Sequence, residues 1–139
     1  MKTLKIKTLD KDWRDADEIM LHAVMQILVD YVEKEKPEEN IDWDWNEKHK
    51  QAWKVISDTY DWWKTRRPCR EDILQDVVIP DDYMTFGEQD ENGNYPVIWG
   101  DYPEISEKMA EANRLETERY EEDTEMMKRI VSVREYMWT

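Results

Sequence analysis

Cysteine, glycine and proline are scarce in this chain of 139 residues, which contains one, three and five of them. The single cysteine, Cys69, excludes a disulfide within the chain and a metal cage built from cysteines. Three glycines are too few for the glycine-rich loop that cradles phosphate groups in many nucleotide-binding proteins. We therefore expect a cytosolic protein with no nucleotide-binding loop and no cofactor.

Long apolar runs and an excess of basic residues are also missing. No apolar run approaches the roughly 20 residues that a membrane-spanning helix needs, and the first residues lack the apolar stretch of a secretory signal. The 20 basic residues face 34 acidic ones, which gives a net charge of −14. This charge disfavours direct binding to nucleic acid or to an anionic membrane surface.

Aromatic residues, by contrast, are abundant. Charged residues make up 39% of the chain, a share that is typical of disorder when aromatics are few. Eight tryptophans, seven tyrosines and one phenylalanine instead supply large apolar groups for a core. Together with the length, this composition predicts a single folded domain over residues 1–139.

Two long helices are predicted in the first half of the chain. Residues 15–36 are apolar around most of a helix, with a narrow polar stripe that includes His22, Asp30 and Glu33, and Pro37 ends the pattern. Residues 45–66 repeat apolar residues every three to four positions, which indicates a second helix.

The boundaries of the second helix and a third helix follow from similar signals. Asp44 and Glu47 have the spacing of a capping box at the start of the second helix, and Pro68 ends it. Residues 104–137 predict a long final helix, whose apolar line is interrupted by charged residues for about two turns.

A short β-hairpin is predicted between the second and third helices. Residues 83–87 and 95–99 flank the Asn-Gly pair at 92–93, the strongest short hairpin signal. A two-residue turn at this pair would place Phe86 opposite Trp99.

The N-terminal residues 3–8 alternate between apolar and basic side chains, which predicts a short strand that could join the hairpin. The expected fold class is therefore mainly α: a small helical bundle of three long helices with a short β-hairpin insertion and, as an alternative, a third, N-terminal strand.

The negative charge is concentrated in one third of the chain. Residues 81–104 hold seven acidic residues and no Lys or Arg, and residues 105–125 hold eight acidic and three basic residues. We hypothesise that these residues form an acidic surface that a basic partner recognises; the alternative is a solvated face that keeps the protein soluble. The acidic residues predicted to bind the partner are Asp81, Asp82, Glu88, Asp90, Glu91, Asp101, Glu118, Glu121, Glu122 and Glu125.

A compact basic cluster lies near the end of the second helix, around Pro68. It is interpreted as a complement to the helix dipole and as a set of partners for the acidic last helix. The basic residues of the cluster are Lys64, Arg66, Arg67 and Arg70.

The tryptophans near helix ends suggest contacts with a partner. Adjacent helical residues point about 100° apart, so Trp62 and Trp63 cannot both face one core contact. We expect Trp43 and Trp62 to be exposed anchors for a partner protein or, in a homodimer, for a second copy. The alternative is burial of both neighbouring tryptophans on two sides of a small bundle.

A metal site is a competing hypothesis for the polar stripe of the first helix. His22, Asp30 and Glu33 could face Glu122 of the last helix, and carboxylates on facing helices hold metal ions in helical hydrolases. The alternative is a stripe that is exposed or that pairs with arginines of the last helix.

Three stretches of the sequence carry a resemblance. They are Leu21–Glu35, Ala52–Pro68 and Leu115–Thr139, which together cover 57 of the 139 residues. Their HA…VDYVE, WW…RP and EED…WT segments resemble a group of small proteins encoded by tailed bacteriophages. The resemblance implies phage origin and action in the bacterial cytoplasm or in the phage particle, and it transfers no catalytic residue.

Three functions are consistent with these observations. The leading hypothesis is a non-enzymatic phage accessory protein, which binds and modulates a host or antiviral-defence protein in the cytoplasm of the bacterial host. The first alternative is a metal-dependent, all-α nucleotide hydrolase that uses the helix carboxylates. The second alternative is a component of the virion or of its assembly.

Overall fold

The computed structural model describes residues 3–138 and is mainly helical, with three long helices and one two-stranded antiparallel sheet. It confirms the predicted fold class. The chain divides into two compact units: unit 1 comprises residues 3–70 and 120–138 of the described chain, and unit 2 comprises residues 71–119. The single domain over residues 1–139 stays a prediction, because two compact units that unfold together would still form one domain.

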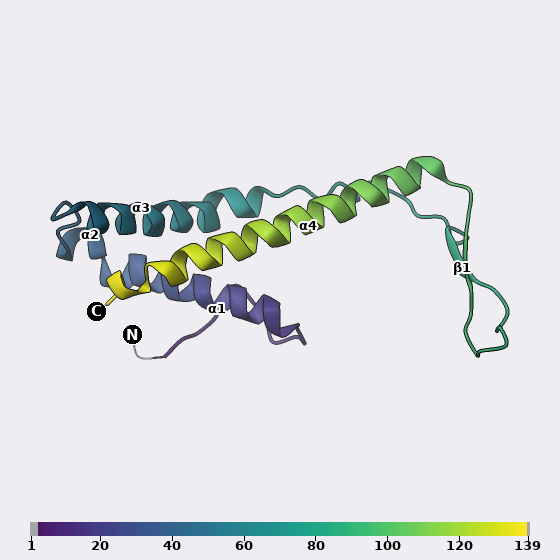
Figure 1. Ribbon diagram of the computed structural model, residues 1–139, viewed down its shortest axis with the longest axis horizontal. Coiled ribbons are helices and arrows are strands. Elements are labelled where there is room, and N and C mark those ends of the chain that lie inside the picture. The colour runs from purple at the N-terminus through teal and green to yellow at the C-terminus, as the bar shows by residue number, and fades with distance from the viewer. Residues whose placement is uncertain (1–2, 139) are drawn as a thin grey trace. The chain divides into compact units, whose positions relative to one another are not determined.

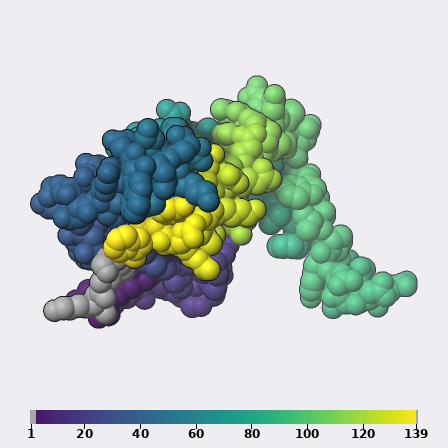
Figure 2. All heavy atoms as spheres, turned by 60° about the vertical axis from the view of Figure 1, so that its left-hand side comes forward, coloured from purple at the N-terminus to yellow at the C-terminus, as the bar shows by residue number. Residues whose placement is uncertain are grey.

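Unit 1 is built from helices α1 (Ala16–Asp30) and α3 (Glu47–Asp61) and from the C-terminal part of α4 (Pro103–Ser132). These three segments lie side by side in Figure 1. In the space-filling view, the C-terminal residues of the chain, in yellow, lie between the purple residues of α1 and the blue residues that lead into α3 (Figure 2). The unit is the predicted three-helix bundle.

The first helix ends where the sequence predicts. Helix α1 continues into a π-helical turn, Tyr31–Glu35, and Lys36 then adopts a left-handed backbone conformation with φ of 47°. Pro37 follows and begins the short helix α2 (Pro37–Asn40), as proline commonly does because the first turn of a helix needs no N–H donor there.

The second helix begins two residues later than predicted. Asn46, and not Asp44, precedes the first helical turn, and its side chain accepts a hydrogen bond of 2.9 Å from the backbone N–H of His49. The capping-box interpretation of Asp44 with Glu47 is therefore wrong, because Asn46 provides the acceptor. After α3 the chain continues as a π-helical turn (Trp62–Arg66) and a 3₁₀ turn (Arg67–Cys69).

The core of unit 1 draws side chains from all three helices and from the turns that extend α1 and α3. Full burial stabilises the fold by about 1.5–3 kcal/mol for each large apolar side chain. The buried apolar residues are Leu21, Met25, Leu28, Val29, Tyr31, Trp43, Ala52, Ile56, Trp62, Trp63, Met126, Ile130 and Val133.

The predicted N-terminal strand is absent. Residues 3–8 form no strand, and the sheet contains only β1 and β2 among the described residues. Side chains of α1 hold this segment instead: the Lys7 N–H donates to Gln26 Oε1 at 3.1 Å, and Thr8 Oγ1 hydrogen-bonds His22 Nδ1 at 2.7 Å.

Unit 2 contains the hairpin, formed by β1 (Met84–Phe86) and β2 (Val97–Trp99). The hairpin confirms the prediction, but its register differs from the predicted one. Phe86 lies opposite Val97, and Trp99 lies opposite Met84, so the expected Phe86–Trp99 pair does not form. The connection is longer than a two-residue turn, since Asp90 organises the loop between the strands.

Candidate functional site

The hairpin of unit 2 has an apolar face. Directly opposed residues of an antiparallel pair point to the same side of the sheet. Met84 and Trp99 therefore share a side with Phe86 and Val97, and we call these four residues the hairpin face. Their exposed fractions lie between 44% and 66%, so the described residues leave much of this face open to solvent. Isolated two-stranded hairpins are marginally stable in water, and such a face gains stability when something packs on it.

Aromatic contacts and one close backbone approach organise the base of the hairpin. The Tyr83 ring meets the Trp99 ring edge-on at 5.6 Å, and the Gly100 N–H donates to the Tyr83 carbonyl at 2.9 Å. A Cβ atom at Gly100 would lie 2.5 Å from the Asp82 carbonyl oxygen, so only glycine fits there. The Tyr102 hydroxyl donates to the Asp82 carboxylate, and this hydrogen bond raises the pKa of Tyr102.

The loop end of the hairpin is organised by Asp90. Its Oδ1 accepts hydrogen bonds of 2.9 Å from the backbone N–H groups of Asn92 and Asn94. Its carbonyl accepts a third from Gly93, whose φ of 81° favours glycine. The structure shows a structural role for Asp90 in the loop, and its predicted role in partner binding stays a prediction.

Carboxylates flank the hairpin face at both ends of the hairpin. All six acidic residues predicted here are exposed, and no Lys or Arg occurs between residues 81 and 104. Any positive charge that balances them would have to come from outside this segment. The residues at the loop end are Glu88, Asp90 and Glu91, and those at the base are Asp81, Asp82 and Asp101.

The acidic residues predicted on the last helix have a different environment. Arginines one turn away pair with two of them: Arg114 contacts Glu118 at 2.6 Å, and Arg129 contacts Glu125 at 3.5 Å. Glu121 is exposed. Since arginines partly neutralise most of these helical carboxylates, the hairpin carboxylates are the better candidates for recognition by a basic partner.

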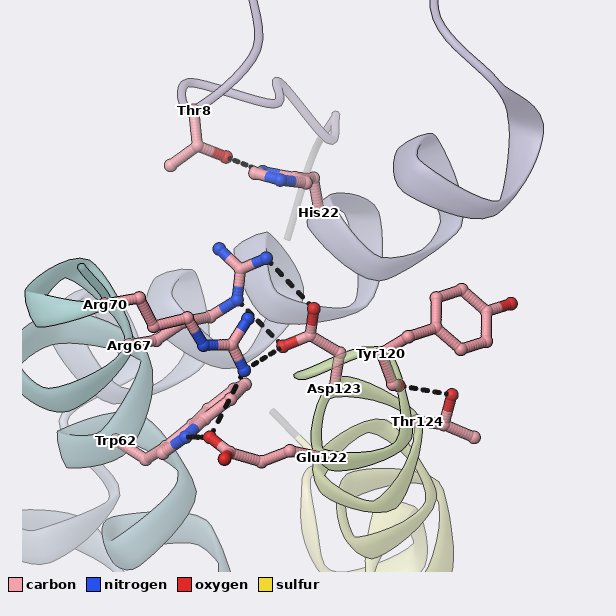
Figure 3. Close-up of polar contacts among 9 residues, drawn as sticks. All are labelled: Thr8, His22, Trp62, Arg67, Arg70, Tyr120, Glu122, Asp123 and Thr124. Atoms are coloured by element: carbon pink, nitrogen blue, oxygen red, sulfur yellow. Dashed lines mark hydrogen bonds and ion pairs between the residues drawn. The ribbon is translucent and has the colours of Figure 1, made fainter. Parts of the chain in front are cut away.

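Glu122 belongs to an arginine–carboxylate cluster, which we define as Arg67, Arg70, Glu122 and Asp123 (Figure 3). Arg67 binds both Asp123 oxygens, at 2.9 and 3.1 Å, and Arg70 bridges Asp123 at 2.8 Å and Glu122 at 3.2 Å. Burial raises the pKa of Asp123, but hydrogen bonds from both arginines outweigh it and hold this pKa below its ordinary value. The cluster joins the turn after α3 to α4, which confirms that two residues of the basic cluster are partners for the acidic helix.

Trp43 and Trp62 are not exposed anchors. Their exposed fractions are 8% and 4%, and Trp63 is buried as well. Trp62 donates its indole N–H to Glu122 of α4, whereas the Trp63 ring packs edge-on against His22 of α1 at 5.0 Å. The 100° between neighbouring side chains thus directs them to two different helices, and burial on two sides is the correct alternative.

The residues of the predicted metal site do not converge. Asp30 accepts from Lys34 at 2.9 Å and from Gln26 at 3.0 Å, inside unit 1. Glu33 accepts from the Tyr60 hydroxyl at 2.8 Å and from Lys64 at 3.1 Å.

The other two predicted ligands are also occupied, since His22 hydrogen-bonds Thr8 and Glu122 lies in the arginine–carboxylate cluster. Among residues 3–138, no three His, Cys, Asp or Glu side chains are grouped so that they could hold a metal ion. The metal-site hypothesis is therefore wrong, because Lys and Arg side chains provide the positive charge that these carboxylates need.

Comparison with known proteins gives no match to a family model, to a curated protein or to a solved structure. Within the described part of the chain, none of the helices has both the length and the apolar character needed to cross a membrane. A functional assignment for this chain must therefore come from its own surfaces.

Proposed function

We propose that this chain is a non-enzymatic binding protein that docks on another protein through the hairpin of unit 2. One observation carries the proposal: an exposed apolar face lies between two groups of carboxylates, in a segment that has no basic residue. The partner surface that fits it has an apolar patch flanked by lysines and arginines.

The two parts of the surface have different physical roles. Phe86 and Trp99 are the aromatic anchors, because large rings that become buried at the centre of an interface contribute most of its affinity. The flanking carboxylates attract a basic partner over distance and oppose an acidic one, which affects the association rate and the specificity. Binding should therefore weaken as salt concentration rises.

The resemblance to small proteins of tailed bacteriophages supports a cellular location and a class of partner for this proposal. A small tailed-phage protein of this kind would act in the cytoplasm of the bacterial host, where it would bind and modulate a host or antiviral-defence protein. The arginines of the basic cluster that contact α4, Arg67 and Arg70, are paired with Asp123, which makes them less available to an acidic partner.

Affinity capture from bacterial lysate, followed by titration calorimetry with each purified partner, tests the anchors. The double variant F86S/W99S should lose a partner that the wild type binds, because the apolar anchors are removed. The matched control is W13S/W45S, which removes two other exposed tryptophans, in unit 1, and should bind like the wild type.

Charge reversal tests the second half of the proposal. E88K/E91K should weaken binding and reduce its dependence on salt, whereas E121K, at an exposed carboxylate of α4, should have little effect. Partners that bind F86S/W99S as tightly as the wild type, or whose binding is the same at low and high salt, would refute the proposal.

A further inference from the structure

A pocket of about 470 Å³ lies in unit 1, between the first half of α1 and one face of α4. Its apolar lining comes from Met20, Leu21 and Met127, and the Tyr120 ring adds an aromatic wall. Leu21 is buried, whereas Met20 and Tyr120 are largely exposed, so the first forms the floor and the other two lie at the mouth. This size is in the range of pockets that bind small molecules, about 300–1,000 Å³.

The polar groups at the inner end of the pocket already have partners (Figure 3). Arg67 binds both oxygens of Asp123, and the Thr124 hydroxyl donates to the Tyr120 carbonyl at 3.0 Å. His22 hydrogen-bonds Thr8 through Nδ1. Since these groups already have hydrogen-bond partners within unit 1, the interior suits an apolar body better than a charged group.

The charge at the mouth is negative. Asp17 and Glu18 line the pocket from the first turn of α1, and Asp17 is exposed. Arg14 pairs with Glu18 at 3.1 Å, and the Asp17 carboxylate accepts a hydrogen bond of 2.8 Å from the neighbouring Glu18 N–H. The N-terminus of a helix attracts anions, but two carboxylates already occupy this end of α1 and favour a cation instead. The exposed Tyr120 ring, which lines the same pocket, also favours a cation through its negative face.

We propose that this pocket binds a small amphipathic cation, with an apolar body between Met20, Leu21 and Met127 and an amine at Asp17. The inference is independent of the proposed function, since it concerns unit 1 and a different ligand. The Met side chains suit this role because they are flexible and polarizable and adapt to the shape of an apolar ligand.

Nuclear magnetic resonance of protein labelled at the methionine methyl groups tests the pocket directly. The probes are 2-phenylethylammonium, neutral 2-phenylethanol and anionic 3-phenylpropionate, which share one apolar body. The ammonium probe should shift the Met20 and Met127 methyl signals with a Kd in the millimolar range, as expected for a small ligand. It should bind more tightly than the alcohol, and the alcohol more tightly than the carboxylate.

Two variants separate the pocket from nonspecific binding. D17N should weaken binding of the ammonium probe by about twofold to fivefold without affecting the alcohol, because an exposed ion pair is lost. D15N, which removes the same charge from a neighbouring residue that does not line the pocket, is the matched control and should bind like the wild type. A16W, at an exposed lining position, should block all three probes.

Four results would overturn the inference. They are methyl shifts confined to other methionines, no saturable shifts at all, carboxylate binding as tight as ammonium binding, and equal effects of D15N and D17N. Circular dichroism of each variant confirms that the helices are intact, so that a loss of binding is read as a change in the pocket.

Discussion

At the residue scale, single side chains of unit 1 act as connectors between helices. Asp123 of α4 receives both Arg67 and Arg70, and its side chain retains only 15% of its exposure. His22 of α1 lies between the N-terminal segment, through Thr8, and the turn after α3, through the Trp63 ring. The sequence made His22 a candidate metal ligand, whereas the structure shows both His22 and Asp123 as connectors within unit 1.

The first prediction concerns Asp123. D123N should lower the free energy of unfolding by about 1–3 kcal/mol at pH 7, because two half-buried guanidinium groups lose their carboxylate. The lowered pKa of Asp123 means that its stabilisation is complete above the ordinary value near 3.8 and is lost as pH falls through the lowered value. Urea denaturation should therefore show a smaller difference between wild type and D123N at about pH 3 than at pH 7. E121Q is the control, and an equal difference at both pH values would contradict the assignment.

The second prediction concerns His22. Burial, followed by repulsion from Arg67, lowers the pKa of His22 below its ordinary value of 6.5. The unfolded chain then binds a proton more readily than the folded one, so His22 contributes stability above pH 6.5 that is lost as pH falls. H22Q should flatten the stability profile between about pH 7 and pH 5. A ring titration by nuclear magnetic resonance with a pKa above 6.5 would show that the sign is wrong.

At the element scale, the hairpin is the feature whose geometry depends most on a few local contacts. Each strand has three residues, and the loop between them depends on the carboxylate of Asp90. This loop changes the register that an Asn-Gly turn alone would produce. It thereby determines that Phe86, Val97, Met84 and Trp99 share one side.

The third prediction tests this loop. D90A removes the acceptor of two backbone N–H groups and should destabilise the loop by about 1 kcal/mol, or roughly fivefold in its opening equilibrium. Amide hydrogen exchange at Asn92 and Asn94 should accelerate accordingly. E91A removes the same charge from the adjacent residue and should leave both amides unchanged; equal acceleration in the two variants would assign the effect to charge alone.

At the scale of the whole molecule, burial is unequal between the two units. All the fully buried large side chains lie in unit 1, among them Ile56 of α3, whereas the hairpin face of unit 2 is exposed. The residues that stabilise the helices are therefore different from the residues that the hairpin exposes to a partner. Substitutions can separate binding from folding.

The fourth prediction follows from this separation. F86S/W99S should change the helical unfolding transition by no more than about 0.5 kcal/mol, since exposed residues contribute little to the core. I56A should destabilise the same transition by about 2–5 kcal/mol, because it leaves a cavity in the core. Thermal and urea denaturation followed by circular dichroism measure both. A large loss of helix stability in F86S/W99S would show that the hairpin and the bundle fold as one unit.

Much of the fold could be predicted from sequence signals that act over short distances. Apolar periodicity and Pro37 located the first helix, and Asn92-Gly93 located the hairpin, because both signals concern neighbouring residues. The prediction of an N-terminal strand was wrong because it depended on contacts with distant residues. Alternating residues such as 3–8 form a strand only when another strand pairs with them, and here Gln26 and His22 of α1 bind this segment instead.

For the candidate site, too, some features follow from the sequence and others only from the tertiary structure. The sequence by itself determined the helical class, the presence of a hairpin and the concentration of acid without base over residues 81–104, because composition and spacing are local properties. Only the tertiary structure decided that Trp43 and Trp62 are buried, that Arg70 pairs with Glu122, and that Trp99 shares an exposed face with Phe86. Burial, pairing and register depend on which distant residues meet, and the free energy of those contacts belongs to the folded chain as a whole.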